Sequence, residues 1–199
     1  MKKKRIVLAS VILGALIAAY VTTSLLLASS SLQVRLGNHI FATETMKIGI
    51  LGDGDNKQIQ FRTEKGDPIE LVEPGMTLRG HFEVRNDSDF AVYYRLYFSK
   101  ADGGLADVMT ATIRNADGTI VFGPVSVRDM TTASTFTDPQ PLGANASQAL
   151  ILELHYPSSA GNDTQNQSLS CCLSVDMTQQ RNNPDKEFSP VEKVPDYTP

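Results

Sequence analysis

The chain contains few cysteines, the residues that form disulfides and reactive thiols. Only two of its 199 residues are cysteines, and these two, Cys171 and Cys172, are adjacent. Adjacent side chains on a strand point to opposite faces of a sheet, so a disulfide joining them would distort the peptide. We therefore expect two reduced thiols, with Cys171 in the core and Cys172 at the surface. A chain of this length buries a sufficient core without disulfide or metal staples.

Motifs of hydrolytic enzymes are absent as well. The three histidines, His39, His81 and His155, are scattered over separate predicted strands, and no H-E-x-x-H motif of a zinc protease is present. The sequence has no G-x-S-x-G motif of a serine hydrolase, and no histidine stands near Cys172 in sequence. We predict no catalytic residue, no cofactor and no metal site.

Basic residues are scarce beyond the N-terminus. The first thirty residues hold four of them, Lys2-Lys3-Lys4-Arg5, and no acidic residue. Without these four, 14 basic residues stand against 22 acidic ones, so the net charge of −4 becomes −8. This acidic body argues against binding of nucleic acid, whose phosphates require a footprint of Lys and Arg. Nor does the sequence contain a basic stripe suited to anionic lipid.

The N-terminal basic cluster precedes an apolar run from Ile6 to Leu27. Two interpretations of residues 1–30 remain open. In the first, these residues form a secretory signal peptide that is cut near Ala18-Ala19 or near Ala28-Ser29-Ser30. In the second, they remain uncut as a membrane anchor helix with the basic end inside. Both place the body outside the cytoplasmic membrane, which it contacts only through this segment.

The rest of the sequence has the period of β-strands. The clearest pattern runs from Met76 to Ser99, where two long strands flank the turn residues Asn86-Asp87-Ser88-Asp89 and are predicted to form a hairpin. Apolar and polar residues alternate in both strands, which indicates a sheet with one dry face. The residues predicted to face the core are Leu78, Phe82, Val84, Phe90, Val92, Tyr94, Leu96 and Phe98.

Further strands show the same alternation. It is clearest from Ala149 to Tyr156 and from Leu169 to Met177. A return strand from Thr119 to Phe122 is predicted to stop at Gly123-Pro124. Short strands at steady spacing with turns between them predict an all-β fold.

These strands define the expected domain organisation. We expect an antiparallel, jelly-roll-like β-sandwich over residues 39–180, preceded by a linker over residues 31–38. Residues 181–199 are rich in Pro, Asp, Asn and Lys, and we expect them to form a flexible tail.

The positions between the predicted core residues form an outward row. This row consists of Arg79, Glu83, Arg85, Tyr93, Arg95 and Tyr97. One interpretation is a solvated sheet face with cross-strand pairs of charged and aromatic side chains. The alternative is a face that binds a partner.

Several short stretches occur in a characteristic order behind the lysine-rich leader. They are Gly37-Asn38-His39-Ile40-Phe41-Ala42-Thr43, Glu73-Pro74-Gly75-Met76, Asn86 with Tyr93-Tyr94-Arg95-Leu96-Tyr97, Pro157-Ser158-Ser159-Ala160-Gly161-Asn162-Asp163-Thr164-Gln165, and Val175-Asp176-Met177-Thr178-Gln179-Gln180-Arg181-Asn182-Asn183. With this ordered set, roughly from Leu36 to Asn183, the chain resembles the TasA/camelysin family of Gram-positive bacteria. The leaders of this family are processed by a SipW-type signal peptidase.

The resemblance implies a secreted jelly-roll subunit of the biofilm matrix or cell surface, often able to polymerise. In such fibres the N-terminal strand of one subunit completes the sheet of the next. Mapped onto this sequence, the donor segment lies between the leader and His39, with Leu32, Val34 and Leu36 as its apolar residues. The implied partners are further copies of the chain, other matrix subunits and the signal peptidase.

Two other functions remain as alternatives. Camelysins carry a metalloprotease label, so the resemblance also allows a surface metalloprotease, although the zinc motif is missing from this sequence. An uncut leader would instead give a membrane-anchored surface module that binds a wall polymer or a host ligand.

Overall fold

The computed structural model describes residues 31–37, 48–52, 58–69, 71–131, 134–161, 164 and 166–188, with the backbone alone for residues 31–37. The predicted signal peptide or anchor over residues 1–30 lies outside the described residues. So do residues 38–47, which include His39, and residues 189–199 of the predicted tail.

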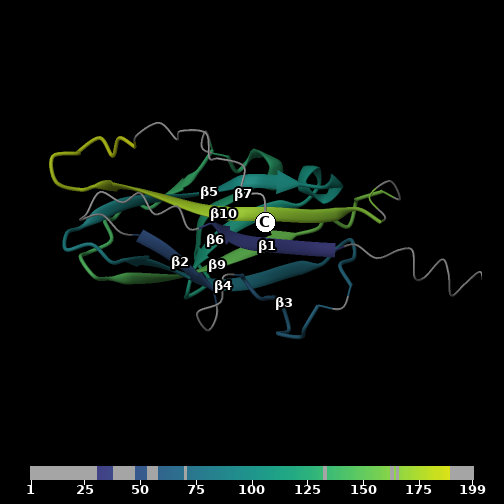
Figure 1. Cartoon of the computed structure of the whole chain (residues 1–199). Coiled ribbons are helices and arrows are strands. Elements are labelled where there is room, and N and C mark those ends of the chain that lie inside the picture. Colours follow the sequence, from purple (N-terminus) through teal and green to yellow (C-terminus); the bar gives the residue numbers. More distant parts are fainter. Residues whose placement is uncertain are drawn as a thin grey trace, which may run out of the picture.

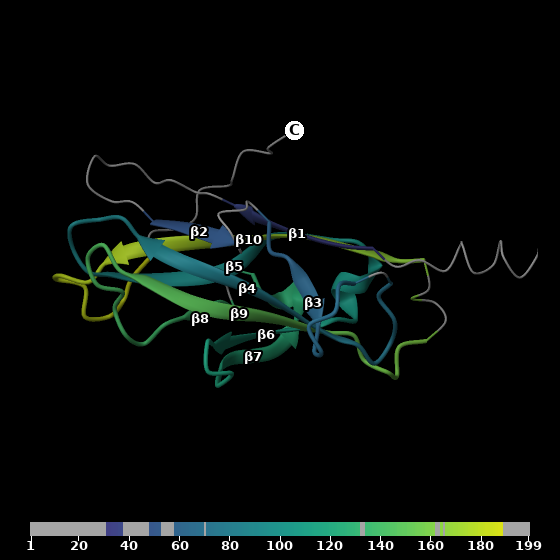
Figure 2. The ribbon, with the colours of Figure 1, turned by 90° about the horizontal axis from the view of Figure 1, so that it is seen from below.

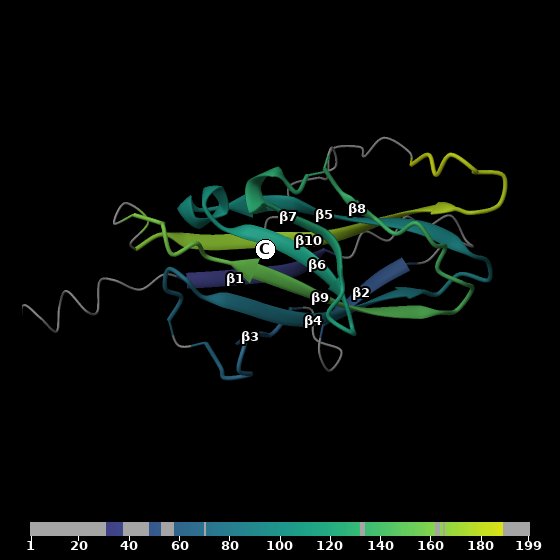
Figure 3. The ribbon, with the colours of Figure 1, turned by 180° about the vertical axis from the view of Figure 1, so that it is seen from behind.

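The described residues form two packed β-sheets (Figure 1). The larger sheet has the order β2 (Ile48–Gly52), β4 (Thr77–Asn86), β9 (Ser147–His155), β6 (Thr110–Asn115) and β7 (Ile120–Ser126), and β3 (Phe61–Thr63) also pairs with β4. The smaller sheet has the order β1 (Ser31–Gly37), β10 (Ser168–Gln179), β5 (Val92–Asp102) and β8 (Phe136–Thr137). Figure 3, seen from behind, shows β9 between β4 and β6.

The neighbouring strands are antiparallel, except that β1 runs parallel to β10. Two short 3-10 helices, η1 (Gly104–Asp107) and η2 (Val127–Asp129), are the helices of the described part of the chain. The predicted all-β class and the packing of two sheets are therefore confirmed.

The core lies between the two sheets, and alternate residues of the central strands point into it. The larger sheet contributes Leu78, Phe82 and Val84 from β4 and Leu150, Leu152 and Leu154 from β9. The smaller sheet contributes Val92, Tyr94, Leu96 and Phe98 from β5 and Leu169, Cys171, Leu173 and Val175 from β10. These are the positions that the period of two predicted, because a sheet packed on one side buries every second residue.

The hairpin predicted between Met76 and Ser99 is wrong, because β4 and β5 belong to different sheets. The chain crosses from one sheet to the other after Asn86. The Nδ2 atom of this buried residue donates to the carbonyl oxygens of Phe90 (2.9 Å), Leu142 (3.2 Å) and Gly143 (2.8 Å). Val92 then forms a bridge with Leu142. The Asn/Asp/Ser segment is therefore a corner fixed by a distant loop, not a turn between paired strands.

The return strand β7 does not stop at Gly123-Pro124 as predicted, but continues to Ser126. Its register against β6 shifts twice in this region, and Gly123 has a φ of 89°. Proline has no N–H to donate, so strands accept it at edges and bulges. Strand β7 meets both conditions, because its pairing with β6 is irregular and it is the last strand in the order of the larger sheet.

Candidate functional site

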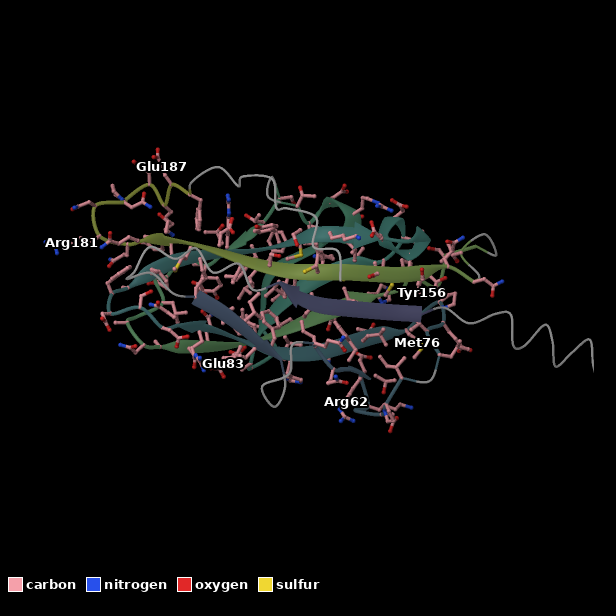
Figure 4. All side chains as sticks on the ribbon, in the orientation of Figure 1. Arg62, Met76, Glu83, Tyr156, Arg181 and Glu187 are labelled. Carbon is pink, nitrogen blue, oxygen red and sulfur yellow. The ribbon has the colours of Figure 1, made fainter. Side chains whose placement is uncertain are left out.

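The six residues of the predicted outward row do not form one face. Strand β4 carries Arg79, Glu83 and Arg85, whereas β5 carries Tyr93, Arg95 and Tyr97, and the two strands lie in opposite sheets. Because both strands direct their alternate residues into the same core, the two sets lie on opposite outer surfaces of the sandwich. Figure 4 shows Glu83 on the side of β4.

On the larger sheet, Arg79 belongs to an ion network centred on Glu153 of β9. The Nε atom of Arg79 donates to Oε2 of Glu153 at 2.7 Å, and Nη2 of Arg114 on β6 donates to Oε1 at 2.8 Å. Arg79 also pairs with Glu64 at 3.0 Å. Burial raises the pKa of Glu153, but the hydrogen bonds from Arg114 and Arg79 outweigh it, so the net pKa is lowered. The network ties β4, β9 and β6 together across the outer surface.

The other two predicted residues of β4 have lesser contacts. Arg85 pairs with Asp87 at 2.8 Å, and both side chains are nearly half exposed. Glu83 is half-buried and lies opposite Leu51 of β2 and Ala149 of β9 in register. Exposed pairs of this kind contribute little stability.

On the smaller sheet, Tyr97 is buried, although the alternation predicted an outward position. Its hydroxyl donates to Oδ1 of Asp176 at 3.1 Å, and the Arg95 guanidinium lies 5.9 Å from its ring centroid. Arg95 in turn donates to Oδ2 of Asp176 at 2.9 Å. Burial and the adjacent Asp176 carboxylate raise the pKa of Tyr97. The Arg95 guanidinium over the ring and the Asp176 carboxylate at the hydroxyl account for the burial of this side chain.

The C-terminal segment covers the other aromatic and cationic residues of the same surface. The Cζ atom of Arg95 lies 4.7 Å from the ring centroid of Phe188. The Nζ atom of Lys186 lies 4.9 Å from the ring centroid of Tyr93 and donates to the carbonyl oxygen of Pro139 at 2.8 Å. Figure 4 shows Arg181 and Glu187 in the segment that follows β10. Lys186 and Phe188, which lie in the predicted flexible tail, therefore contact the sandwich.

The predicted donor segment is strand β1. It lies along the edge of the smaller sheet and pairs in parallel with β10, from Ser31 opposite Ser168 to Gly37 opposite Ser174. Figure 2 shows β1 and β2 together at one edge of the sandwich, with β6 and β7 at the other. The structure thus places Leu32, Val34 and Leu36 at register positions opposite Leu169, Cys171 and Leu173. This β1–β10 edge is the candidate functional site.

The described histidines do not come together. Strands β4 and β9 are neighbours, but His81 is opposite Ile151, and His155 is opposite Thr77, whose Oγ1 lies 3.0 Å from its Nδ1. Within the described ranges, no group of three or more His, Cys, Asp or Glu residues is placed to hold a metal ion. Both cysteines are free, Cys171 buried and Cys172 half-buried, and burial raises the pKa of the Cys171 thiol.

Sequence reasoning missed three polar residues that organise these surfaces, namely Arg114, Glu153 and Asp176. Each occupies an outward position of a central strand that the period of two marks as polar. Each of them has a partner of opposite charge on a neighbouring strand, such as Arg95 opposite Asp176. Such pairs can be recognised in the sequence only when the strand order is known.

The comparisons with known proteins assign no family to this chain. A scan of the chain against protein-family models gives no match, and a search of the curated proteins gives none either. Among the described residues, no helix has the length and apolar character needed to cross a membrane.

Proposed function

We propose that this protein is a secreted structural subunit of the biofilm matrix or cell surface, similar to the TasA/camelysin family, with a jelly-roll arrangement of its two sheets. It adds to a fibre by strand donation, and its working parts are backbone edges. The sequence resemblance supplies the class, and the position of β1 supplies the physical basis.

The position of β1 is the observation that carries the proposal. The segment predicted as a donor forms a strand of seven residues, and among the described strands it is the outermost of its sheet. A strand at an edge is hydrogen-bonded along one side only, so it can leave its own sheet and pair with another. Ten residues, 38–47, separate it from β2, which belongs to the other sheet.

Deletion of residues 32–38 tests the proposal. The protein is secreted with its own leader, purified from the culture medium and examined by electron microscopy at rising concentration. We expect fibres from the unaltered chain, and none from the deletion variant, which keeps a β-rich circular dichroism spectrum. Deletion of residues 189–199 is the control for shortening the chain and should leave fibres intact. Equal fibre formation by the variant lacking residues 32–38 would refute strand donation.

A further inference from the structure

The chain that follows β10 folds into a turn held by Asn183. The Nδ2 atom of this side chain donates to the carbonyl oxygen of Glu187 at 2.9 Å, and its Oδ1 atom accepts from the N–H of Glu187 at 2.9 Å. The same Nδ2 atom donates to Oγ1 of Thr178 on β10 at 2.8 Å. Figure 4 shows this turn at Arg181 and Glu187, beyond the end of β10. We call residues 182–188 the C-terminal clasp.

The clasp contacts two outward positions of β5. The Nζ atom of Lys186 lies 4.9 Å from the ring centroid of Tyr93, and the Cζ atom of Arg95 lies 4.7 Å from the ring centroid of Phe188. Both contacts join a cation to an aromatic ring, and such pairs attract each other. Residues two apart in a strand point to the same face. The spacing of two between Tyr93 and Arg95 is therefore matched by the spacing of two between Lys186 and Phe188.

The sandwich holds this part of β5 in place without the clasp. Arg95 donates to Oδ2 of Asp176 from Nε at 3.1 Å and from Nη2 at 2.9 Å, and its side chain is 14% exposed. The hydroxyl of Tyr97, whose ring lies 5.9 Å from the Arg95 guanidinium, donates to the same carboxylate. These contacts do not involve the clasp. The surface beneath it is therefore preformed, which lowers the cost of binding another segment.

The clasp itself is held weakly. Asn183, Lys186 and Phe188 are half-buried, and the other residues of the clasp are exposed. Lys186 has a φ of 54°, in the left-handed region that costs free energy for a residue with a Cβ atom. Release of the clasp relieves this strain, so a competing segment can replace it.

We propose that the outer surface of β5 at Tyr93 and Arg95 is a peptide-binding site, which the C-terminal clasp occupies as an internal ligand. Its external ligand is a segment of another protein that carries Lys or Arg and, two residues later, an aromatic ring, as Lys186 and Phe188 do in the clasp. Beyond the leader, 14 basic residues stand against 22 acidic ones, and this net charge of −8 attracts basic segments. The inference goes beyond the proposed fibre formation, because β1 takes no part in the site.

The attached clasp determines how readily the site opens. A segment tethered beside its own site is present there at an effective concentration on the order of 1 mM. A free partner therefore binds weakly to the intact chain and more tightly to a chain whose clasp is weakened. Loss of the Asn183 hydrogen bonds should lower the partner concentration needed by about tenfold.

A single tryptophan can report the position of the clasp, because the chain contains none. Tryptophan offers the most favourable ring for a cation, so Phe188→Trp in the full secreted chain should keep the contact with Arg95. We expect its emission to lie at shorter wavelength than in the urea-unfolded protein and to be less quenched by acrylamide. Emission at the unfolded wavelength in native buffer would overturn the clasp as an internal ligand.

Displacement by a peptide tests the site in this reporter variant. The probe is a synthetic peptide with capped ends and the sequence of residues 182–188. We expect it to shift the tryptophan emission toward the unfolded wavelength with a saturable dependence on concentration, and a peptide with alanine in place of both Lys186 and Phe188 should have no effect. Addition of Asn183→Ala should move the midpoint to about tenfold less probe, whereas Asp185→Asn, at an exposed position of the clasp, should leave it unchanged.

Direct binding is measured on a chain whose site has been emptied. In the full-length double variant Lys186→Ala with Phe188→Ala, the fluorescently labelled probe should bind about tenfold more tightly than to the unaltered chain, as measured by anisotropy. Addition of Tyr93→Ala removes a ring from the site itself and should weaken this binding by about tenfold at an unchanged circular dichroism spectrum. A second probe, with only the Lys and the Phe kept two apart in a Gly-Ser frame, should also bind.

The outcomes separate the site from the class of partner. Failure of the clasp-sequence probe to bind the emptied chain, or equal binding by the alanine peptide, would overturn the peptide-binding site and leave the clasp as a structural turn. Binding by the clasp-sequence probe but not by the Gly-Ser probe would overturn the proposed partner class and assign the site to the C-terminal segment of a second copy. Both measurements are independent of fibre growth, so the proposed function is tested separately.

Discussion

Asn86 holds the corner at which the chain passes between the sheets. Its Nδ2 atom donates hydrogen bonds to three carbonyl oxygens, and its Oδ1 atom accepts a hydrogen bond from the N–H of Ser88 at 3.0 Å. Alanine would remove these four hydrogen bonds from the corner, and we expect Asn86→Ala to lower the free energy of unfolding by about 2–4 kcal/mol. Urea unfolding measures this. Asp89→Ala, exposed in the same loop, is the control and should stay within about 0.5 kcal/mol of the unaltered chain.

Glu153 gives the stability of the fold a predictable dependence on pH. Its pKa is lowered in the folded state from an ordinary value of 4.5. A lowered folded pKa adds stability above the unfolded pKa, and this stability is lost as the pH falls through the folded pKa. We expect Glu153→Gln to lower the free energy of unfolding by about 1–3 kcal/mol at pH 7, and the difference from the unaltered chain to shrink below about pH 4.5.

Urea unfolding at a series of pH values measures the effect of Glu153. Glu83→Gln is the matched control, because it removes the same charge from the neighbouring strand without altering the pairs of Glu153 with Arg79 and Arg114. A difference for Glu153→Gln that stays constant from pH 7 to pH 3 would contradict the assigned pKa shift.

Strands β9 and β10 show how much of an element the sequence determines. Their apolar residues recur at every second position, and the structure buries Leu150, Leu152 and Leu154 in one and Leu169, Leu173 and Val175 in the other. The period of two follows from the geometry of an extended chain, so it is readable without knowledge of any partner. The same holds for the all-β class.

The partners of each strand were not readable in the same way. The segment after Asn86 has the composition of a hairpin turn, yet it is a corner because Leu142 and Gly143, more than fifty residues later, complete it. A local pattern cannot report such a contact. For the same reason the prediction of one outward row from β4 and β5 failed, and Phe188 was assigned to a flexible tail although it packs against Arg95.

Among the described strands, β7 lies at the end of the larger sheet and carries no protective charge. Its seven residues carry no charged side chain, and the exposed large hydrophobic residues of the described chain, Ile120 and Val121, stand next to each other in it. Such edges favour pairing between molecules unless a charge blocks it. We expect Val121→Lys to reduce concentration-dependent light scattering of the monomer fraction.

A matched charge outside the strand tests the cause. Thr119→Lys adds the same charge in the turn before β7. Both substitutions bring the acidic body closer to neutrality, which by itself promotes association. Lower scattering for Val121→Lys and not for Thr119→Lys identifies the edge as the source, whereas equal scattering of both variants would exclude it.

For the whole molecule, the start of β1 at Ser31 favours one of the two cut sites proposed for a cleaved leader. A cut near Ala28-Ser29-Ser30 leaves β1 directly at the new N-terminus, whereas a cut near Ala18-Ala19 leaves the apolar Leu25-Leu26-Leu27 attached to it. In the proposed assembly by strand donation, an apolar extension would hinder the donated strand. For the proposed secreted subunit we expect an intact mass that places the N-terminus between residues 28 and 31, and retention of residues 1–27 would favour the anchored alternative.

The parallel pairing of β1 with β10 also gives a direction to any assembly built on it. The strand and the edge that receives it are different parts of one molecule, so their contact has no two-fold symmetry and need not close into a ring. Every subunit in such a filament would point the same way. One tip would carry a vacant β10 and the other an unused β1, and the two tips would therefore elongate at unequal rates.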